Sequence, residues 1–397
     1  MNLSKKFLGV SPSPTLSIDA KFKQMKADGL NVVGFGAGEP DFDTPKHIKD
    51  AAIKAINDGM TKYTPASGII PLKKAVCKKL KEDNNLDYEP SQIVISNGAK
   101  HSLMNVFGAI LNPGDEVIIP APYWVSYPEM IKLNDGVPVV IHTDESTHFK
   151  ISAKQIEEKI TDKTRAIVLN SPSNPTGMVY SQEELSEIAK VCLAHSLFVV
   201  SDEIYEYLIY DGNKHLSIAE LGDDIKDLTI IVNGVSKTYA MTGWRIGYTA
   251  SNPTIAKIMS NVQSHATSNP NTIAQYAALA ALEGPKDELY KMVGEFEKRR
   301  NYMHDRIKKI DGVSCLNPHG SFYILMNISK LFGKTYNGRK IETADDFADM
   351  FLESKLVAVV PGTGFEAPDF VRWSYATSME NIKEGLDRLE SFLSELK

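Results

Sequence analysis

The stretch 236-SKTYAMTGWRIG-247 gives the most direct indication of this chain's fold and chemistry. It places one lysine, Lys237, and one arginine, Arg245, among small residues and glycines. A lysine amine condenses with an aldehyde to form a Schiff base, and the planar guanidinium of arginine holds a phosphate at two points. Pyridoxal 5′-phosphate (PLP) carries both groups, so the stretch predicts a PLP site. A lone lysine near a strand is usually just exposed, so the prediction depends on the accompanying motifs.

Length and composition indicate a globular enzyme. The 397 residues exceed the roughly 250–300 at which single hydrophobic cores stop growing, which predicts two domains. With 43% hydrophobic and 24% charged residues, the chain fits neither a disordered nor a membrane class. The net charge of −6 offers nucleic acid no basic surface. No signal-like apolar run follows Lys5 and Lys6, so we expect a cytoplasmic protein with no nucleic-acid or membrane partner.

The cysteines and histidines indicate neither a disulfide framework nor a metal site. Cys77, Cys192 and Cys315 are odd in number, far apart and without a C-x-x-C spacing. The nine histidines contain no H-E-x-x-H pair. We therefore expect reduced, packed cysteines and no metal ion.

Apolar runs of strand length alternate with helical patterns through most of the chain. This alternation is typical of βαβ units, so the predicted fold is α/β with a mostly parallel sheet. The expected strands are residues 92–96, 116–120, 137–141, 165–170, 198–202 and 229–232. The expected helices lie near residues 103–110, 155–160 and 183–195.

A long charged helical pattern over residues 286–309 leads into a second, smaller unit. Short strands are expected there near residues 321–327, 357–360 and 371–375, with a final helix near 382–396. We divide the chain into an N-terminal arm with part of the small domain (1–45), a large PLP-binding domain (46–285) and a small C-terminal domain (286–397).

Two glycine motifs do not fit other cofactors. Residues 34–39 read GFGAGE, in which the third glycine comes one position early for the dinucleotide motif G-x-G-x-x-G. Residues 333–335 read GKT, but Ile328 stands where a phosphate loop needs its first glycine. Nicotinamide and ATP sites are therefore not expected.

Polar residues follow several predicted strands, at the sheet edge where open α/β sheets bind ligands. Asn174 lies in a Pro-fixed turn and could face a ligand, although such a sequence also forms ordinary turns. Asp202 ends a β-branched strand just before Tyr205, where a carboxylate could pair with a pyridine nitrogen or simply cap a helix. Trp124 could stack on a planar ring or fill the core. Residues 97–100 precede a helix whose N-terminus could bind phosphate.

These motifs together resemble the class I aminotransferases, within the fold-type I PLP enzymes, and specifically their prokaryotic-type aspartate aminotransferase subgroup. The resemblance runs from Ser13 to the C-terminal helix. It implies that Lys237 forms the Schiff base with PLP and moves a proton between substrate and cofactor, with Asp202 and Tyr205 as the other catalytic residues. Asp202 would keep the pyridine nitrogen protonated. Asn174 and Tyr205 would donate hydrogen bonds to the ring oxygen, and Trp124 would stack on the ring.

The same resemblance implies a phosphate site shared between two subunits. Residues 61–65, TKYTP, match a segment whose tyrosine, here Tyr63, reaches the phosphate of the neighbouring subunit. A homodimer with shared active sites is therefore implied. Within one subunit the implied phosphate ligands are Gly98, Ala99, Lys100, Ser236 and Arg245.

Substrate anchoring is also implied by the resemblance. Residues 371–378 are apolar apart from Arg372, and a buried arginine needs an anion, which would be the substrate α-carboxylate rather than a structural carboxylate. The distal carboxylate of aspartate or glutamate would be bound by a serine, a threonine and a lysine. The full set of implied substrate contacts is Ser13, Thr15, Gly38, Lys100, Trp124, Asn174 and Arg372.

We therefore expect an aspartate aminotransferase that converts aspartate and 2-oxoglutarate to oxaloacetate and glutamate by a ping-pong route through pyridoxamine phosphate. Relatives that use prephenate carry a lysine where this chain has Ser11, and residues 69–72, IIPL, lack the usual glutamate. The alternatives are an aromatic, alanine or prephenate aminotransferase, or a PLP-dependent β-eliminating lyase. A PLP-binding transcription regulator would need a DNA-binding domain, for which we expect no room before Ser13.

Overall fold

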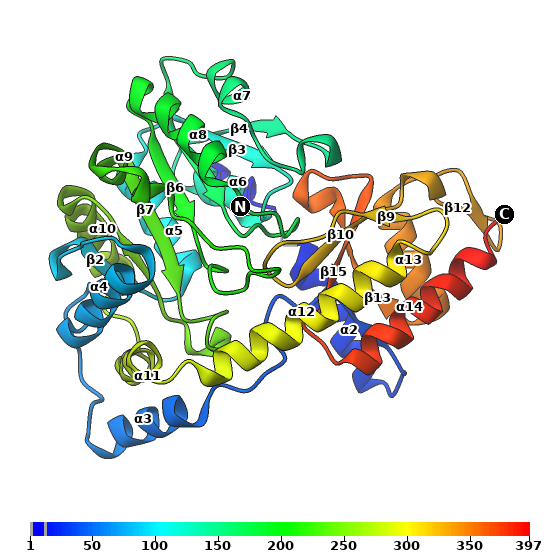
Figure 1. The fold of residues 1–397 in the computed structure, drawn as a ribbon, viewed down its shortest axis with the longest axis horizontal. Helices are drawn as coiled ribbons and strands as arrows, with labels where there is room; N and C mark the ends of the chain where they lie inside the picture. The colour runs from blue at the N-terminus through cyan, green and yellow to red at the C-terminus, as the bar shows by residue number, and fades with distance from the viewer. Residues whose placement is uncertain (1–2, 12–13) are drawn as a thin grey trace.

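The computed structural model describes residues 3–11 and 14–397, and its largest sheet has seven strands in the order β2-β8-β7-β6-β5-β3-β4 (Figure 1). Neighbouring strands are parallel except around β8, which runs antiparallel to both β2 and β7. The predicted α/β fold with a mostly parallel sheet is confirmed. The bounds are β2 Ile93–Ser96, β3 Glu116–Ala121, β4 Val137–His142, β5 Thr164–Asn170, β6 Phe198–Asp202, β7 Thr229–Gly234 and β8 Gly247–Ala250.

Both faces of this sheet are buried, which explains why its strands are continuous apolar runs instead of alternating ones. Two of the helices that pack on it are α5 (Ala99–Ile110) and α8 (Gln182–His195). Val168 of β5 packs in one core with Leu103 of α5, whereas its neighbour Ile167 packs in another with Leu185 of α8. Because successive side chains of a strand point to opposite faces, a strand such as β5 contributes side chains to two hydrophobic cores.

A second, antiparallel sheet has four strands in the order β14-β15-β10-β9. Its core is rich in aromatic residues and includes Phe35, Phe322 and Trp373. The long helix α12 (Asp287–Ile307) leads from the seven-stranded part to this one (Figure 1). The strands are β9 Ser314–Cys315, β10 Tyr323–Asn327, β14 Val360–Pro361 and β15 Phe370–Ser374, and the helices beside them are α13 Ala344–Lys355 and α14 Met379–Ser394.

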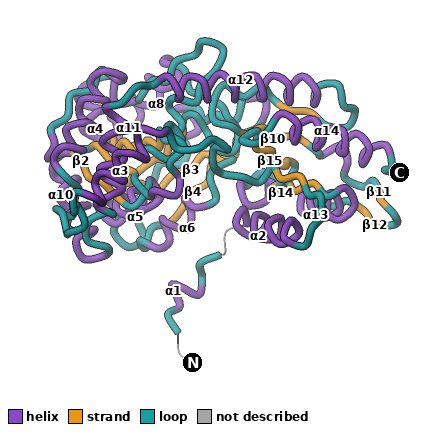
Figure 2. The backbone as a smooth tube through the Cα atoms, turned by 90° about the horizontal axis from the view of Figure 1, so that it is seen from below, coloured by secondary structure: helices purple, strands orange, loops and turns teal. Residues whose placement is uncertain are grey.

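The other elements complete these two parts, and Figure 2 shows helices enclosing the strands while α1 extends away from them. Two small pairs, β1 with β13 and β11 with β12, lie outside the larger sheets. No helix of the described residues is long and apolar enough to span a bilayer. The bounds are α1 Lys5–Leu8, α2 Pro14–Ala27, α3 Lys46–Asn57, α4 Ile70–Asn84, α6 Ser126–Leu133, α7 Ala153–Glu157, α9 Asp223–Leu228, α10 Pro253–Ala266, α11 Thr272–Glu283, β1 Val33–Gly34, β11 Thr335–Tyr336, β12 Arg339–Lys340 and β13 Val357–Ala358.

Three of the differences between the predicted and the observed elements concern β8, the strand expected over 357–360 and the helix expected near 155–160. β8, a four-residue strand directly after the Lys237 segment, has no counterpart among the predicted strands. The strand expected over 357–360 is two short strands, β13 and β14, which pair with different partners. The helix expected near 155–160 begins at Ala153, where Ser152 caps it through the amide of Gln155, and ends at Glu157.

Candidate active site

A cavity of about 470 Å³ opens at the carboxyl ends of β5 and β6. Its size is within the usual range for small-molecule sites. Residues from both sheets line it, including Asp202 after β6 and Arg372 on β15. The predicted site residues that line it are Gly38, Ala99, Lys100, Trp124, Asn174, Asp202, Tyr205, Ser236, Lys237, Arg245 and Arg372.

Three of the predicted site residues are not placed at this cavity, while Gly98 adjoins it as the N-cap of α5. Tyr63 is 91% exposed and lies on the outer surface before α4. Ser13 lies outside the described residues, and for Thr15 only the backbone, within α2, is described. The described residues of one subunit therefore place none of these three side chains at the cavity.

Lys237 lies in the loop between β7 and β8, and its ammonium donates a hydrogen bond to the Gly38 carbonyl. Burial lowers the pKa of Lys237 to about 8; the Glu39 carboxylate opposes the shift, while Arg245 and Arg372 add to it. A lysine with a lowered pKa has a larger fraction of free amine near neutral pH. It is therefore suited to attack an aldehyde and to exchange protons.

Asp202 presents a buried carboxylate to the cavity, with 4% of the residue exposed. The Tyr127 hydroxyl donates to Asp202 Oδ2 at 2.6 Å, and the Ile204 amide donates to Oδ1 at 3.3 Å. Burial raises the pKa of Asp202 to about 6, and the hydrogen bonds from Tyr127 and Ile204 limit that rise. No basic side chain of the described residues forms an ion pair with this carboxylate, so a cationic ligand would stabilise its charge.

Arg372 is the complementary case, a buried cation without a protein anion among the described residues. It is 2% exposed, donates from Nη1 to Asn174 Oδ1 at 2.9 Å and from Nη2 to the Gly36 carbonyl at 3.2 Å. Its Nε has no hydrogen-bond partner in the described part of the chain. Burial lowers the pKa of Arg372. An anion in the cavity would complete its hydrogen bonds and compensate its charge.

The N-terminus of α5 and Arg245 form an end of the cavity that is suited to bind a phosphate group. The first amides of α5 point outward without helical acceptors. A side chain at Gly247 would bring its Cβ to 2.3 Å from the Ala99 amide, so only glycine lets β8 approach this helix start. Arg245 has the left-handed φ of 57° and donates to the Thr242 and Asn97 carbonyls at 2.9 and 3.4 Å. Ser236 lies beside it, buried.

Trp124 provides a half-buried ring on the cavity wall. It packs edge-on against Tyr127, with centroids 5.4 Å apart. The ammonium of Lys100 lies 5.0 Å from the Trp124 ring centroid. Burial, and secondarily Arg245, lower the pKa of Lys100. The indole face and the Lys100 ammonium therefore define one side of the space in which a planar ligand would lie.

Nine residues that line the cavity are not among the predicted site residues: Lys23, Gly36, Ala37, Glu39, Tyr127, Asn170, Ile204, Thr242 and Tyr323. Tyr127 follows Trp124 by three residues, and Tyr323 lies within the strand predicted over 321–327, but neither position has a local signal of function. Both enter the site through tertiary packing, since Tyr127 is 1% exposed on α6 and Tyr323 is 1% exposed on β10.

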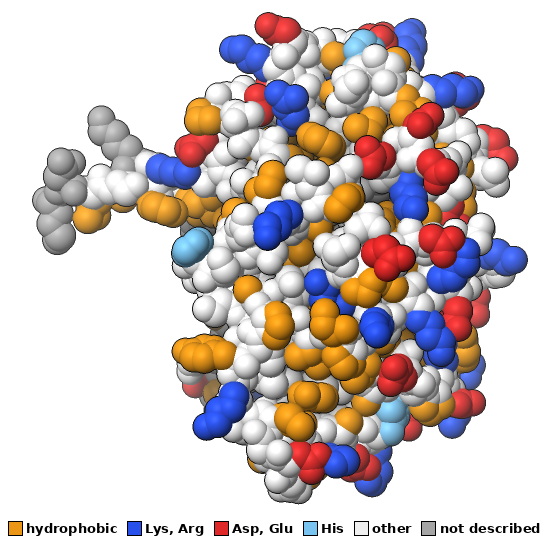
Figure 3. All heavy atoms as spheres, turned by 90° about the vertical axis from the view of Figure 1, so that its left-hand side faces the viewer, with side chains coloured by type: hydrophobic (Ala, Val, Ile, Leu, Met, Phe, Trp, Pro, Cys, Tyr) orange, Lys and Arg blue, Asp and Glu red, His pale blue; other side chains and the backbone are white. Residues whose placement is uncertain are grey.

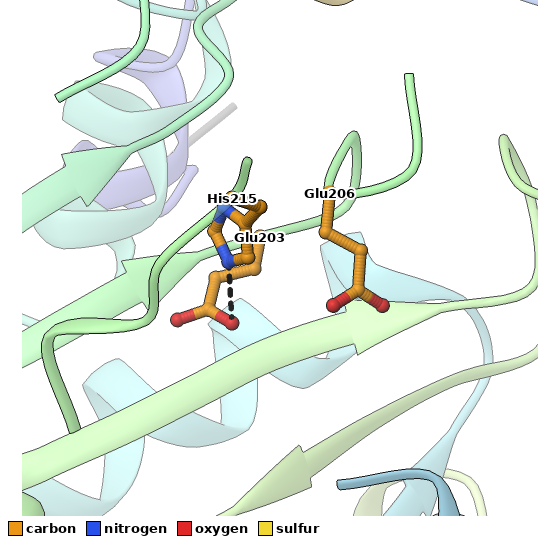
Figure 4. A group of neighbouring side chains, drawn as sticks. All are labelled: Glu203, Glu206 and His215. Atoms are coloured by element: carbon orange, nitrogen blue, oxygen red, sulfur yellow. Dashed lines mark ion pairs between the residues drawn. The ribbon is translucent and has the colours of Figure 1, made fainter. Parts of the chain in front are cut away.

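A second buried charge cluster lies beyond Asp202, where Glu203, Glu206 and His215 bring potential metal-ligand atoms within 4.8 Å of one another (Figure 4). Protein groups already bind these acids. Lys79 forms an ion pair with Glu206 at 2.5 Å, and His215 Nε2 lies 3.2 Å from Glu203 Oε2. Because an ammonium group is already in contact with Glu206, we interpret the cluster as a network of ion pairs and not as a metal centre.

Comparison with known proteins extends these findings. Residues 31–389 match the family described as aminotransferase class I and II. The chain is 50% identical over 393 residues to the aspartate aminotransferase of Bacillus subtilis (strain 168), covering 99% of each protein. It is 46% identical to a probable aspartate/prephenate aminotransferase of Aquifex aeolicus, again with 99% of each covered. Among solved structures, the aspartate aminotransferase of Rhizobium meliloti superposes with a TM-score of 0.96 at 42% identity, covering 100% of both chains. That of Thermus thermophilus with maleate gives 0.93 at 39% identity, covering 99% of this chain and 100% of the other.

Proposed function

This chain belongs to the class I and II aminotransferase family, and from that premise we propose that it is an aspartate aminotransferase that exchanges the amino group between aspartate and 2-oxoglutarate. The observation that carries the proposal is that one cavity brings together a lysine of lowered pKa, a buried carboxylate and a buried arginine that forms no ion pair among the described residues. These are the groups that PLP chemistry on an amino acid needs.

The cavity fits PLP by the chemistry of its donors. PLP, when bound, supplies an electron sink for the bonds at the substrate Cα. The Asp202 carboxylate would hold the proton of the ring nitrogen, and the Trp124 indole would cover the ring. The side chains of Asn174 and Tyr205 would donate to the ring oxygen, and Lys237 would hold the aldehyde carbon.

The phosphate would be held at the other end of the same cavity. The amides of Ala99 and Lys100 at the start of α5 would donate to it, as would the Ser236 hydroxyl. Arg245 would add a charge-assisted bond. Gly98 supports this geometry, because a Cβ there would come within 2.6 Å of Arg245 Nη2.

Lys237 would carry the mobile proton. Its Nζ would accept the proton from the substrate Cα and return it to the cofactor side. With a pKa of about 8, its amine is basic enough to accept that proton, and its ammonium releases it readily near neutral pH. Tyr205 and Asp202 would hold the ring in place during this transfer.

Arg372 would bind the α-carboxylate that all amino-acid and 2-oxo-acid substrates share. The backbone at Gly38 lies against the same part of the cavity. We propose that Lys100, with Ser13 and Thr15 from the N-terminal segment, binds the distal carboxylate of aspartate or glutamate. The dicarboxylate maleate in the Thermus thermophilus structure supports this substrate class.

We also propose a cytoplasmic homodimer in which Tyr63 of each subunit completes the phosphate site of the other. Two features support a dimer: the 91% exposure of Tyr63 and the hydrophobic side chains that gather on the face with α3, α10 and α11 (Figure 3). Exposed apolar residues on α3 and α10 include Ile53, Ile56, Ile258 and Val262. Such a face is typical of a subunit interface.

The domain limits are proposed in the same way: residues 46–285 form the cofactor-binding domain, and residues 1–45 with 286–397 form the smaller one. The division of the strands between the two larger sheets supports these limits. Arg372 would then come from the small domain and Lys237 from the large one.

Prephenate transamination is the second candidate, because several relatives at 46% identity are named aspartate/prephenate aminotransferases. Ser11 counts against it, since it offers no charge for a second carboxylate at that position. Transamination of aromatic amino acids or alanine, and β-elimination, would not need Lys100.

One assay panel tests the proposal. Purified, PLP-loaded protein is given aspartate, alanine, phenylalanine or prephenate, each with the matching 2-oxo acid or amino donor, and kcat/KM is compared. Aspartate and glutamate should be the best pair. A higher kcat/KM for alanine or phenylalanine, or release of ammonia without transamination, would overturn it.

A further inference from the structure

Tyr323 is a cavity residue that contacts groups from both sheets. It is 1% exposed at the start of β10 and lines the site. Its hydroxyl lies 3.1 Å from that of Tyr205, and the Arg372 guanidinium lies 4.3 Å from its ring centroid. Tyr205 follows β6 of the seven-stranded sheet, whereas Tyr323 and Arg372 belong to the four-stranded one. One side chain therefore contacts groups from both parts of the molecule.

The sheet register explains the contact between Tyr323 and Arg372. In the antiparallel pair of β10 and β15, Tyr323 lies opposite Ser374, two residues from Arg372. Side chains two residues apart lie on the same face, and such diagonal neighbours are within reach of long side chains. The guanidinium accordingly lies over the Tyr323 ring, with Phe365 5.0 Å away as its second aromatic neighbour.

The direction of the tyrosine hydrogen bond follows from proton counting. A tyrosine hydroxyl has one proton to donate. If Tyr205 donates its proton to the cofactor's ring oxygen, its own oxygen can only accept, and among the described residues the Tyr323 hydroxyl is the group hydrogen-bonded to it. Tyr323 must then donate to Tyr205. Hydrogen bonds in such a chain polarise and strengthen one another.

We propose that Tyr323 is a positioning residue that links the α-carboxylate anchor, Arg372, to the hydrogen bond that Tyr205 makes with the cofactor. The hydroxyl sets the strength and orientation of Tyr205 as a donor, and the ring supports the guanidinium. This inference rests on the proposed function. It concerns the link between the α-carboxylate end and the cofactor end of the site, where Tyr323 contacts both Tyr205 and Arg372.

The test uses Tyr323→Phe, which keeps the ring beneath Arg372 and removes only the hydroxyl. A weaker Tyr205 donor leaves more charge on the ring oxygen, so the pKa of the protonated linkage between Lys237 and the cofactor should rise. A pH titration of the cofactor's visible absorption measures this in the holoenzyme without any substrate. The charged groups that face Tyr205 are Arg372, Asp202 and Lys237, and the variant leaves all three unchanged.

The kinetic expectation is a fall in kcat of about two- to tenfold, the size of one neutral hydrogen bond, with little change in KM. In the Tyr205→Phe background, Tyr323→Phe should cause no further shift, because the bond it removes is already lost. Tyr375→Phe is the matched control: Tyr375 is buried in the same aromatic core and donates to the Ser321 carbonyl at 3.2 Å, away from Tyr205. It should leave the titration unchanged.

If Tyr323→Phe does not fold or does not retain PLP, Tyr323→3-fluorotyrosine replaces it. Fluorine makes the hydroxyl a stronger donor at nearly constant size, so the pKa of the linkage should move down. An unchanged titration in these variants, or an equal shift in Tyr375→Phe, overturns the link. The proposed function fails separately, if the wild type does not transaminate aspartate.

Discussion

Asp202 and Glu203 are neighbours in sequence, yet their carboxylates lie in two different kinds of environment. Asp202 faces the cavity, where Tyr127 and an amide bind it and no cation of the described protein does. Glu203 faces a closed network in which the hydroxyls of Ser201 and Ser217 donate to Oε1 at 2.8 and 2.6 Å and His215 lies against Oε2. Successive residues leaving a strand point to opposite sides, so one residue step separates the two environments.

The second cluster is balanced by the protein itself. Lys79, 5.6 Å from the Tyr207 ring centroid, pairs with Glu206, and the Asn233 amide donates to the same carboxylate at 2.9 Å. In the cavity, the carboxylate of Asp202 and the guanidinium of Arg372 each lack an ion-pair partner among the described side chains. Buried charges that the protein pairs belong to the fold, whereas buried charges left without a partner are available to ligands.

Lys237 and Lys79 give the largest contrast. Lys237→Ala should lower kcat by at least about 10²–10⁴-fold, the range for loss of a general acid–base group, because it removes the amine proposed to move the proton of the substrate Cα. Borohydride reduction of the holoenzyme followed by peptide mapping measures the linkage. Lys237 should be labelled, and Lys79, which is paired with Glu206, should stay unlabelled. A label on any other lysine contradicts the assignment.

Substitutions of the neighbouring acids Asp202 and Glu203 should affect different properties: the first should lower activity and the second should lower stability. Asp202→Asn removes the charge that would hold the ring nitrogen's proton, so the rate of the single half-reaction should fall by several tenfold steps, each worth roughly 1.4 kcal/mol. Its free energy of unfolding should change little, since no cation of the described residues loses an ion-pair partner. Rapid mixing of PLP-loaded enzyme with aspartate measures the rate, and urea unfolding measures the stability.

Glu203→Gln is the matched variant with the opposite expectation. It leaves the charge of His215 unpaired, and breaking a buried pair costs about 3–5 kcal/mol of unfolding free energy. The half-reaction rate of the folded fraction should stay within about threefold of wild type, roughly 0.6 kcal/mol. If Glu203→Gln lost its rate and kept its stability, the contrast between the two clusters would be wrong.

Much of this arrangement follows from sequence. The β-branched runs ending at Asn170 and Asp202 predict strands, and parallel strands carry their terminal residues to one edge, so Asn174, Asp202 and Lys237 were expected together. The family resemblance added Arg372, which has no local signal beyond one charge in an apolar run. All four of these residues line the same cavity.

Other parts depend on tertiary packing and could not be derived. Tyr127 and Tyr323 resemble core aromatic residues, and only the docking of α6 and β10 brings their hydroxyls to Asp202 and Tyr205. His215 is twelve residues from Glu203, in a loop without periodicity. β8 was missed because four residues after a glycine-rich segment carry too little pattern to indicate a strand.

Within the cavity, the two anion-binding ends should differ in specificity. Arg372→Ala should lower kcat/KM for every amino acid, because each has an α-carboxylate. Lys100→Ala should act mainly on dicarboxylates and reduce the ratio of kcat/KM for aspartate to that for alanine by about 10–100-fold, from a charge-assisted bond of roughly 1.5–3 kcal/mol. Steady-state assays of both substrates measure the ratio. Equal losses for aspartate and alanine in Lys100→Ala would reject its role.

The smallest effect concerns the closed cluster and its dependence on pH. Burial lowers the pKa of His215, but the charge and contact of Glu203, with Glu206 adding and Lys79 opposing, bring the pKa above its usual 6.5. A raised pKa stabilises the fold below pH 6.5, and this contribution is lost as the pH rises through the raised value. Burial raises the pKa of Glu203, but His215 and the two serines bring it below its usual 4.5, so its contribution is lost only as the pH falls through that lowered value.

The pair should therefore stabilise the protein most between about pH 4.5 and 6.5, set by the usual pKa values of glutamate and histidine. His215→Asn removes the titrating ring, and its melting temperature should approach that of wild type as the pH is raised from 6.5. One kilocalorie per mole corresponds to about 1 °C for a chain of this length, so the convergence should amount to roughly 1–2 °C in differential scanning calorimetry.

The control is His195→Asn, at an exposed pair with Glu157, where screening by solvent should leave no such trend. If the difference between wild type and His215→Asn widened above pH 6.5, His215 would be stabilising the fold as a neutral ring, and the closed cluster would not be balanced by charge.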